Sequence, residues 1–490
     1  MNKLLFTLFC IFLFAPGISA NAQSCGVSAV YGGGPFYKTP STSIPEIRSS
    51  GFTTAIIWTI HIDTAGNFNY NAEFPIVANG QYTGHNTHAD FPQNVALLKM
   101  QPTSVTRIEA GLSAWGSSTF QNIKNLINAH GTGPTTNLYR NFKVLKDSIP
   151  QIDAINFDDE VTYDISTSVQ FALMLGNLGY KVTLCPYTNA SYWTSVASQT
   201  NAQAPGTVDR VYLQCYDGGA GNSPCSATWN FGSVPVYPGL WDMNYSPSGV
   251  QTKMTSWKNQ CGIDGGFMWL YDDFKNTVKT QQYANAINTA VGIGAPATAS
   301  GPGPADNTTG VSLQAAVSWN DTGTCAQSFN VYFGTTNPPP FIANQATAVY
   351  HPGALLPHTT YYWRIDPKNY FGTATGNVWK FTTGFAAGIT TPEANTGIGE
   401  VYPNPFTDQA SIDLFIPADA AVNISVLDLY GHEVYAAGNN RAAQEKYTFT
   451  WYGTNAKGQQ LAAGVYYIKV TMTGKQGVIA TENRKVLLVR

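Results

Sequence analysis

The chain has 490 residues, more than one hydrophobic core usually serves, so about three domains are expected. Charged residues make up only 11%, against a usual value of ~25%, a composition typical of extracellular proteins. Lys and Arg total 26 and Asp and Glu total 29, which excludes a basic field of the kind that attracts nucleic acid or an anionic membrane.

The N-terminus has the pattern of a signal peptide spanning residues 1–22. A positive start precedes the apolar run Leu4–Ala15, and Ala20-Asn-Ala22 matches an Ala-x-Ala cleavage site. The run is too short to span a bilayer, and no other segment is long and apolar enough, so no transmembrane segment is expected. A retained anchor and a lipoprotein site at Cys25 are the less favoured alternatives.

Two linkers are predicted at 292–304 and 384–397, because these stretches are rich in Gly, Ala, Pro and Thr. They predict three domains in the mature chain: 23–293, 299–384 and 398–490.

The first region alternates β-branched runs with helical patterns. The expected strands are Gly26–Tyr31, Thr53–Ile62, Val105–Leu112, Ile152–Asp158, Lys181–Pro186, Arg210–Tyr216, Val234–Leu240 and Gly266–Tyr271. The expected helices are Thr119–His130, Leu138–Ser148, Thr167–Leu178, Ser191–Ser198, Ser248–Gln260 and Thr277–Ala290. Eight such strands predict a (β/α)8 TIM barrel. A doubly wound sheet is disfavoured because Gly32-Gly-Gly34 leads into Pro35 and not into a phosphate-binding helix.

The second region has no helical period, and its runs predict an all-β sandwich. The segments Tyr361–Asn369 and Trp379–Thr383 resemble a fibronectin type III-like module, with their Tyr and Trp residues in the core. Trp319 is expected in the core, with a sugar-binding platform as the alternative.

The third region also predicts an all-β sandwich. Its segments Val401–Phe406, Ile424–Val434, Trp451–Gly453 and Gly464–Val470 together resemble the C-terminal sorting domain of type IX secretion substrates. The resemblance implies export across the outer membrane, with the type IX secretion machinery as a partner. An ordinary structural sandwich is the alternative.

Six cysteines remain after the signal peptide, an even number that permits disulfides in an exported protein. Either Cys215–Cys225 or Cys225–Cys261 is the favoured pairing. No spacing matches a zinc site and the histidines are scattered, so no metal and no cofactor are expected. His85 and His88 are expected as loop residues, with metal binding as the alternative.

The strongest chemical signal is the segment Ile152–Glu160. Alternation along a strand places Asn156, Asp158 and Glu160 on one side, which faces the interior if this is a barrel strand. Two carboxylates two residues apart on one face repel each other, so one pKa rises, as a general acid requires. An acidic loop after the strand is the alternative.

The same segment resembles the Asp-x-x-Asp-x-Asp-x-Glu signature of glycoside hydrolase family 18, with Asn156 where the family has Asp. Arg210–Asp217 resembles the family's sixth strand, and Gly265–Asp273 its eighth, although Trp269 comes one residue early, which leaves its direction open. The family's Ser-x-Gly-Gly motif is degraded at 111–115. The ending Phe157–Glu160 is most similar to the endo-β-N-acetylglucosaminidase branch; chitinases form the other.

The resemblance implies a substrate-assisted, retaining mechanism. Glu160 is the expected general acid and base, Asp158 orients the substrate's acetamide group, and Tyr216 binds the acetamide oxygen. The expected substrate contacts are Asn156, Gln214, Asp217 and Trp269. The implied partner is a glycan or glycoprotein containing N-acetylglucosamine.

Two other functions stay open: a weak or inactive family member that binds glycans at the cell surface, and a surface scaffold. Asn156, the early Trp269 and the degraded motif at 111–115 favour the glycan-binding alternative. Asp272 and Asp273 are interpreted as either helix caps or second acids at the barrel mouth. Core packing is favoured over a sugar platform for Trp58, Trp115, Trp193 and Trp241.

Overall fold

The computed structural model describes residues 25–490 except 114–117, 385–396, 417–419, 440–444 and 475–476. The expected signal peptide, most of the second linker and Trp115 therefore lie outside the described residues. The chain forms two compact units. One contains the described residues up to Ala299 together with 321–329 and 366–375, and the other contains the remainder.

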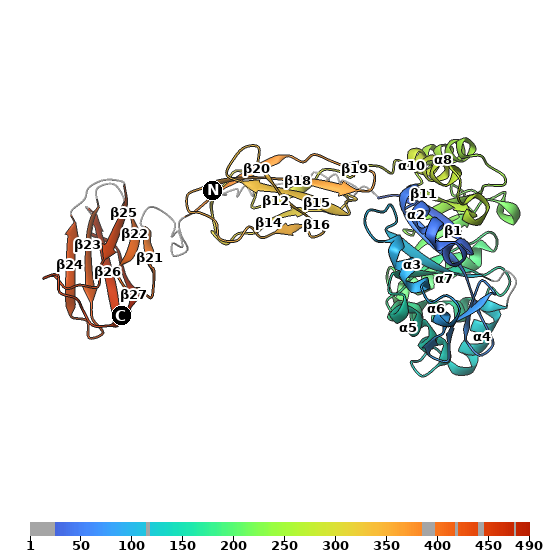
Figure 1. The fold of residues 1–490 in the computed structure, drawn as a ribbon, viewed down its shortest axis with the longest axis horizontal. Coiled ribbons are helices and arrows are strands. Elements are labelled where there is room, and N and C mark those ends of the chain that lie inside the picture. Colours follow the sequence, from blue (N-terminus) through green and yellow to red (C-terminus); the bar gives the residue numbers. More distant parts are fainter. Residues whose placement is uncertain (1–24, 114–117, 385–396, 417–419, 440–444, 475–476) are drawn as a thin grey trace, which may run out of the picture. The chain divides into compact units, whose positions relative to one another are not determined.

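The first unit is a closed barrel of eight parallel strands surrounded by helices (Figure 1). Its strands, in order around the ring, are β1 (Val27–Gly32), β2 (Thr54–Ile62), β6 (Arg107–Ser113), β7 (Ile152–Asp158), β8 (Lys181–Leu184), β9 (Val208–Gln214), β10 (Val236–Trp241) and β11 (Gly265–Trp269). Pairing of β1 with both β2 and β11 closes the ring. This closed ring confirms the predicted barrel. Parallel, β-branched strands that are buried on both faces favour such an arrangement.

The helices cover the outside of the barrel. They are α1 (Pro35–Lys38), α2 (Pro40–Ser50), α3 (Phe91–Leu98), α4 (Thr119–His130), α5 (Asn137–Ser148), α6 (Ile165–Asn177), α7 (Ala190–Gln203), α8 (Pro247–Cys261), α9 (Tyr271–Phe274) and α10 (Lys279–Val291). The side chains of Thr136, Asp164 and Ser246 each accept a hydrogen bond from the first turn of α5, α6 and α8, respectively, which fixes where these helices begin.

Two connections depart from the predicted βα alternation. After β2, the chain inserts the antiparallel strands β3 (Phe68–Tyr70), β4 (Phe74–Ala78) and β5 (Gln81–Tyr82), followed by the 3-10 turn η1 (Gly84–Asn86). Between β9 and β10, the described chain forms only the 3-10 turns η2 (Asp217–Gly219) and η3 (Ala227–Trp229). The Cys225–Cys261 disulfide, one of the two favoured pairings, joins this connection to the end of α8.

The barrel interior is filled with large side chains. Tyr31, Tyr212 and Phe267 are fully or almost fully buried and pack ring against ring. Gly239 on β10 makes room for Phe267, because a Cβ at that position would overlap the phenyl ring. At the amino-terminal end of the strands, Arg107 forms ion pairs with Glu109 and Asp209. The barrel is therefore a packed core, and any binding site lies at its mouth.

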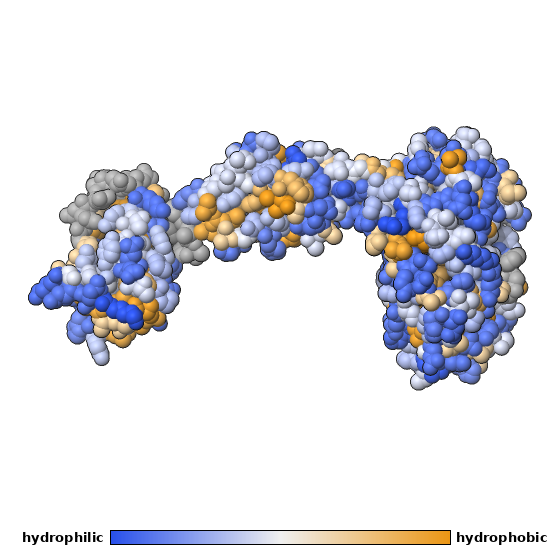
Figure 2. Space-filling model, in the orientation of Figure 1, coloured by the Kyte–Doolittle hydropathy of each residue, from blue (hydrophilic) through white to orange (hydrophobic). Residues whose placement is uncertain are grey.

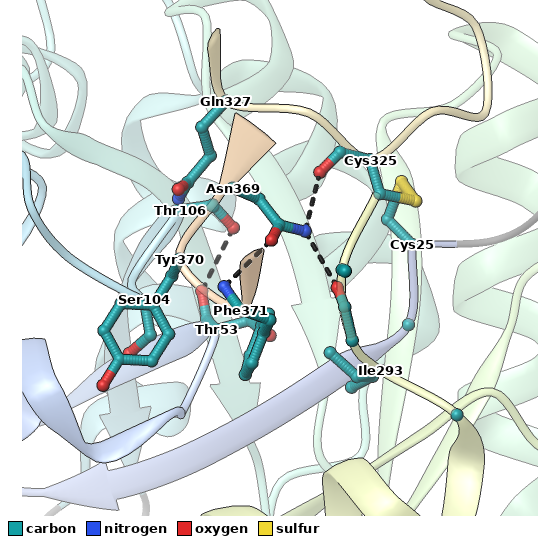
Figure 3. A pocket seen from close by; sticks show the side chains of 14 residues that line it. Cys25, Thr53, Ser104, Thr106, Ile293, Cys325, Gln327, Asn369, Tyr370 and Phe371 are labelled. Atoms are coloured by element: carbon teal, nitrogen blue, oxygen red, sulfur yellow. Dashed lines mark hydrogen bonds between the residues drawn. A yellow bond between two sulfur atoms is a disulfide. The ribbon is translucent and has the colours of Figure 1, made fainter. Parts of the chain in front are cut away.

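A second disulfide, Cys25–Cys325, closes a small cavity of about 70 Å³ within the first unit (Figure 3). Asn369 bridges its lining, since Nδ2 donates to the backbone oxygens of Gly294 and Cys325 while Oδ1 accepts from Phe371 N. Segments 321–329 and 366–375 thus pack with the barrel. This packing is why they belong to the first unit, although the predicted domain 299–384 includes them.

The predicted all-β regions that follow the barrel are confirmed. One sheet has the order β12 (Ser300–Gly303), β14 (Val317–Asn320), β17 (Val349–Tyr350). The other has the order β13 (Thr308–Val311), β20 (Val378–Thr383), β18 (Thr360–Asn369), β15 (Ser328–Gly334), β16 (Phe341–Gln345), with β19 (Gly372–Thr373) paired to β18. Trp319 is buried, so its expected core position is confirmed. Figure 2 shows apolar residues gathered on one face of this region, whose exposed hydrophobic residues include Phe341 and Ile342.

The last region contains two further sheets. Their orders are β21 (Gly397–Tyr402), β22 (Ala410–Ile416), β25 (Glu445–Trp451), and β24 (Glu433–Asn439), β23 (Ala421–Leu427), β26 (Gly464–Gly474), β27 (Gly477–Leu488). Residues of β23 and β26 alternate between buried and mostly half-buried positions, and Trp451 packs against Phe406 and Tyr466 in the core. Among the described residues of the whole chain, no helix is long and apolar enough to cross a membrane.

Candidate functional site

The candidate site is a cavity of about 570 Å³ at the carboxyl ends of the barrel strands. Inward-facing residues at these ends converge on the barrel axis, which is where barrel enzymes place their reactive groups. The lining consists of Tyr31, Trp58, Asp158, Glu160, Cys185, Tyr187, Gln214, Tyr216, Asp217, Gly218, Trp269 and Leu270. Six of the seven site residues named from the sequence are in this lining, and the seventh, Asn156, is not.

Asp158 is the last residue of β7 and is buried at the bottom of the cavity. Gln214 Nε2 donates a hydrogen bond to its Oδ1 over 3.1 Å. Burial, and then the negative charge of Glu160, raise the pKa of Asp158 to about 8, although hydrogen bonds from Ser113 and Trp58 oppose the rise. The Asp158 carboxyl group is therefore mostly protonated at pH 7.

Glu160 follows two residues later and is only partly buried. Burial raises its pKa above the usual value, and the charges of Asp159 and Asp217 raise it further. The sequence argument expected one carboxyl group of the pair to be shifted. Both are shifted, because both are partly or fully removed from water and each lies near other acids.

Asp159 lies between these two acids in sequence, but its side chain holds the loop after β7. Its carboxylate accepts hydrogen bonds from the backbone amides of Val161, Thr162 and Tyr163 and from the Tyr192 hydroxyl. Asp159 is almost fully buried and is not in the cavity lining. The alternation that separates the inward Asp158 and Glu160 from Asp159 thus gives the three neighbouring acids different environments.

Asn156 is fully buried below the cavity. Its Nδ2 donates to Thr183 Oγ1 over 2.8 Å, and its Oδ1 accepts from the Tyr31 hydroxyl over 3.1 Å. Thr183 in turn donates to Glu109 Oε2 over 2.6 Å. These contacts place Asn156 in a buried chain of hydrogen bonds one layer beneath the cavity. Its expected contact with substrate stays a prediction.

Aromatic rings form one wall of the cavity. Trp269 stacks with Tyr216, with ring centroids 6.3 Å apart and an interplanar angle of 17°, and meets Trp58 edge to face at 5.0 Å. Trp269 lies two residues after Phe267 on β11, so the two side chains are on the same face of the strand. The Phe267 ring fills the barrel interior, so both side chains point inward. The direction of Trp269, left open by its early position in the motif, is therefore toward the cavity.

The last residue of β9 and the chain directly after it supply four lining residues, Gln214, Tyr216, Asp217 and Gly218. Gln214 bonds both Asp158 and the backbone oxygen of Cys185, which fixes its amide at the base of the cavity. Tyr216 is almost completely buried, and burial raises the pKa of its hydroxyl well above the usual value, so this group stays a proton donor. Asp217 begins η2 with a positive φ of 46°, which turns the chain at the mouth of the site.

Sequence reasoning did not select Tyr31, Tyr187 or Cys185 as site residues. Tyr31 faces inward near the end of β1, and its hydroxyl lies 3.1 Å from both Asn156 Oδ1 and Cys185 Sγ. Cys185 and Cys215 are free and buried, so the favoured pairing Cys215–Cys225 is wrong. An inward position at the carboxyl end of a strand was the available signal for Tyr31 and Cys185.

The other candidates have different roles. Asp272 accepts hydrogen bonds from the backbone amides of Gly33 and Gly34, so its carboxylate holds the loop after β1. His88 packs against the rings of Tyr37 and Phe74. Within the part of the chain that the structure describes, no group of three His, Cys, Asp or Glu residues could hold a metal ion. Trp193 is buried in the core, as expected.

Comparisons with known proteins give one family match and several structural likenesses. Residues 404–476 match the FlgD Ig-like domain family. No curated protein matches the chain. Chitinase ChiA74 from Bacillus thuringiensis is similar over 94% of this chain and 98% of its own, at 10% identity and a TM-score of 0.39.

Two other chitinases are similar at 12% identity. Active domain 2 of a thermostable chitinase from Pyrococcus furiosus aligns over 55% of this chain and 96% of its own, with a TM-score of 0.37. The cell-surface-expressed chitinase ChiW from Paenibacillus sp. str. FPU-7 aligns over 73% of this chain and 43% of its own, with a TM-score of 0.35. These likenesses assign no activity to the chain.

Proposed function

We propose that the barrel is a retaining glycoside hydrolase that cleaves β-linkages in glycans containing N-acetylglucosamine, with Glu160 as general acid and base. The observation that carries this proposal is that Asp158, Glu160 and Tyr216, which come from two separate sequence motifs, line one cavity. The raised pKa of Glu160 supports its role, since a general acid must hold its proton near neutral pH. The aromatic wall supports a sugar ligand, because a pyranose packs its C–H face on aromatic rings.

In the proposed reaction, Glu160 protonates the glycosidic oxygen as its bond to the anomeric carbon breaks. The carbonyl oxygen of the substrate's own acetamide group attacks the anomeric carbon, and Tyr216 donates a hydrogen bond to that oxygen. Asp158 acts in its ionised form, after it has released its proton to solvent, and accepts a hydrogen bond from the acetamide N–H. The positive charge that develops beside it favours this ionised form. Glu160 then takes a proton from water as the water oxygen bonds to the anomeric carbon and the bond from that carbon to the acetamide oxygen breaks. The two displacements together retain the configuration.

The test is release of oligosaccharide from a panel of N-glycoproteins and N-acetylglucosamine oligomers. Glu160→Gln removes the transferable proton and is expected to lower the rate by at least about 100-fold. Glu400→Gln, an exposed substitution in the other compact unit, is the matched control. Equal rates for the wild type and Glu160→Gln would overturn the role of Glu160.

A glycan-binding protein without turnover is the second candidate, and Asn156 is the observation that favours it. The family resembled by this segment has an acid at that position, whereas Asn156 is neutral and tied to Thr183 and Tyr31. In that case the wild type and Glu160→Gln both bind oligosaccharide, and neither releases product.

We also propose that the protein is exported, with a signal peptide ending at Ala22 and a C-terminal region, 398–490, that addresses the type IX secretion machinery. Two disulfides support an oxidising compartment. The Cys25 thiol is bonded to Cys325, so it is not free to carry a lipid, which favours cleavage after Ala22 over a lipoprotein site. N-terminal sequencing of the secreted protein tests the cleavage site. A chain truncated before residue 398 tests the C-terminal signal, because it should not reach the medium.

A further inference from the structure

The cavity wall opposite Trp58 and Trp269 contains Tyr187, a residue that the proposed reaction does not use. In the ring of eight strands, β8 lies four strands from β1 in either direction. Tyr187, just after β8, therefore faces the wall formed by Tyr31, Trp58 and Trp269 across the cavity that all four residues line. The carboxylates of Glu160 and Asp217 come from the strands on either side of β8, so they flank this tyrosine.

Tyr187 is held in place by the connection that follows β9. A Cβ added to Gly218 would come within 3.0 and 3.1 Å of the Tyr187 ring, so the backbone at Gly218 directly supports the ring. Asn222 Nδ2 donates to the Tyr187 backbone oxygen over 2.7 Å and to the Gln214 oxygen over 2.9 Å. Its Oδ1 accepts from Trp229 Nε1 over 3.2 Å, which anchors the connection. The ring is therefore preorganised, and it is only partly buried.

The two walls correspond to the two sides of the bond to be cleaved. Under the proposed function, Asp158, Tyr216 and Trp269 hold the sugar that carries the reacting acetamide group. Glu160 donates its proton to the oxygen that joins this sugar to the leaving sugar, so the leaving sugar lies on the other side of Glu160. The cavity of about 570 Å³ falls within the range of ~300–1,000 Å³ typical of small-molecule sites, and it continues to Tyr187.

We infer that Tyr187, supported by Gly218 and Asn222, is the stacking platform for the leaving sugar and therefore a specificity-determining residue. This inference rests on the proposed function for the assignment of the two sides. The same platform accepts an incoming sugar, because transfer to an acceptor is the reverse of the first half-reaction. In transfer, the acceptor's hydroxyl oxygen bonds to the anomeric carbon, the bond from that carbon to the acetamide oxygen breaks, and the hydroxyl proton passes to Glu160.

The first experiment measures binding without turnover. In the Glu160→Gln background, the Kd for the N-acetylglucosamine tetramer is measured by tryptophan fluorescence. Tyr187→Ala is expected to weaken binding about ten-fold, the upper end of what one aromatic contact contributes. Tyr187→Phe keeps the ring and is expected to recover most of this loss. Tyr430→Ala, at a position 86% exposed in the other compact unit, is the matched control.

The second experiment uses the otherwise unmodified enzyme with added N-acetylglucosamine as acceptor and measures the ratio of transfer to hydrolysis. Tyr187→Ala is expected to lower this ratio about ten-fold, because the acceptor sugar loses the same aromatic contact that the leaving sugar loses. Gly218→Ala is expected to lower it less, because the new methyl group displaces the ring without removing it. An unchanged ratio in both variants would overturn the platform.

The outcomes separate the inference from the proposed function. Tetramer binding that depends on Tyr187, with no product from the wild type, would refute the hydrolase and retain the platform in a glycan-binding protein. Product release with Kd and transfer ratio independent of Tyr187 would refute the platform alone. Absence of tetramer binding in every variant, with no product from any substrate of the panel, would refute both.

Discussion

Gln214 Nε2 lies within hydrogen-bond distance of Asp158 Oδ1 and of the Cys185 backbone oxygen, 3.1 Å from each. One amide group from β9 thus ties a carboxyl group on β7 to the end of β8, the strand between them. Because the backbone oxygen cannot move independently of the barrel, Gln214 fixes the position of Asp158. Gln214 is a positioning residue for the proposed reaction as well as part of the cavity lining.

Replacing Gln214 with Met is expected to lower kcat about ten-fold with a smaller change in KM. The substitution removes the hydrogen bond and keeps a similar side-chain length, and a lost bond to a group that becomes charged is worth ~1.5–3 kcal/mol. Steady-state kinetics on the best oligosaccharide substrate measure both constants. Gln214→Glu adds a fourth acid to the cavity lining and is expected to lower kcat further. Full activity in both variants would contradict the positioning role.

The pKa of Asp158 predicts how stability varies with pH. A carboxyl group whose pKa is about 8 in the folded state and near 4 in the unfolded state binds more protons when folded between these values, so it costs stability as pH rises from about 4 to 8. Asp158→Asn removes this cost. The variant is expected to gain at least about 1 kcal/mol relative to wild type at pH 8.5 and little at pH 4. Chemical unfolding at the two pH values measures the difference; an equal effect at both would refute the shifted pKa.

Asn156→Asp, which recreates the acid of the family signature, is expected to destabilise the fold and not to raise activity. Thr183 Oγ1 accepts from the Asn156 amide while donating to Glu109 Oε2, so a carboxylate at 156 would face an oxygen that has no proton to offer. A buried polar group left unsatisfied costs ~1–3 kcal/mol. Denaturant unfolding measures the loss, and Asn156→Ser serves as a smaller neutral control. A rise in kcat without loss of stability would show that the buried network adapts.

The Cys225–Cys261 disulfide spans 36 residues and is expected to stabilise the barrel by about 3–4 kcal/mol through loss of chain entropy in the unfolded state. The paired substitution Cys225→Ser with Cys261→Ser removes the bond without leaving a free thiol. The unfolding midpoint of this double variant should be lower than that of wild type. Adding a reductant should also change the midpoint of the variant less than that of wild type. An unchanged midpoint would mean that other contacts already hold the β9–β10 connection.

Local patterns carried enough information to predict the barrel and half of the residues that line the cavity. Runs such as Ile152–Asp158 predict a buried parallel strand, and alternation within the strand assigns the inward side of Asp158. The same rule, applied to the predicted strand Arg210–Tyr216, places Gln214 and Tyr216 on one side. Both line the cavity, although β9 itself ends at Gln214. These residues could be predicted because strand geometry alone fixes their direction.

Other features depend on contacts between distant parts of the chain. Helix α2 contains Pro40 and Pro45 and several Ser and Thr residues, so its local sequence does not favour a helix. Tyr187 gains its position from Gly218 and Asn222, which lie more than thirty residues further along the chain. No pattern in a single sequence predicts such a contact between distant residues. The disulfide between Cys25 and Cys325, 300 residues apart, could not be predicted for the same reason.

The Cys25–Cys325 bond makes a covalent ring of everything between these two residues, including every strand of the barrel. A protease that cuts once inside the ring opens it without releasing a fragment, so the cut remains invisible on a gel until a reductant is added. Cuts after Cys325 release the downstream chain at once. Damage to the barrel and trimming of the C-terminal region therefore leave different signatures when the same sample is compared with and without reduction.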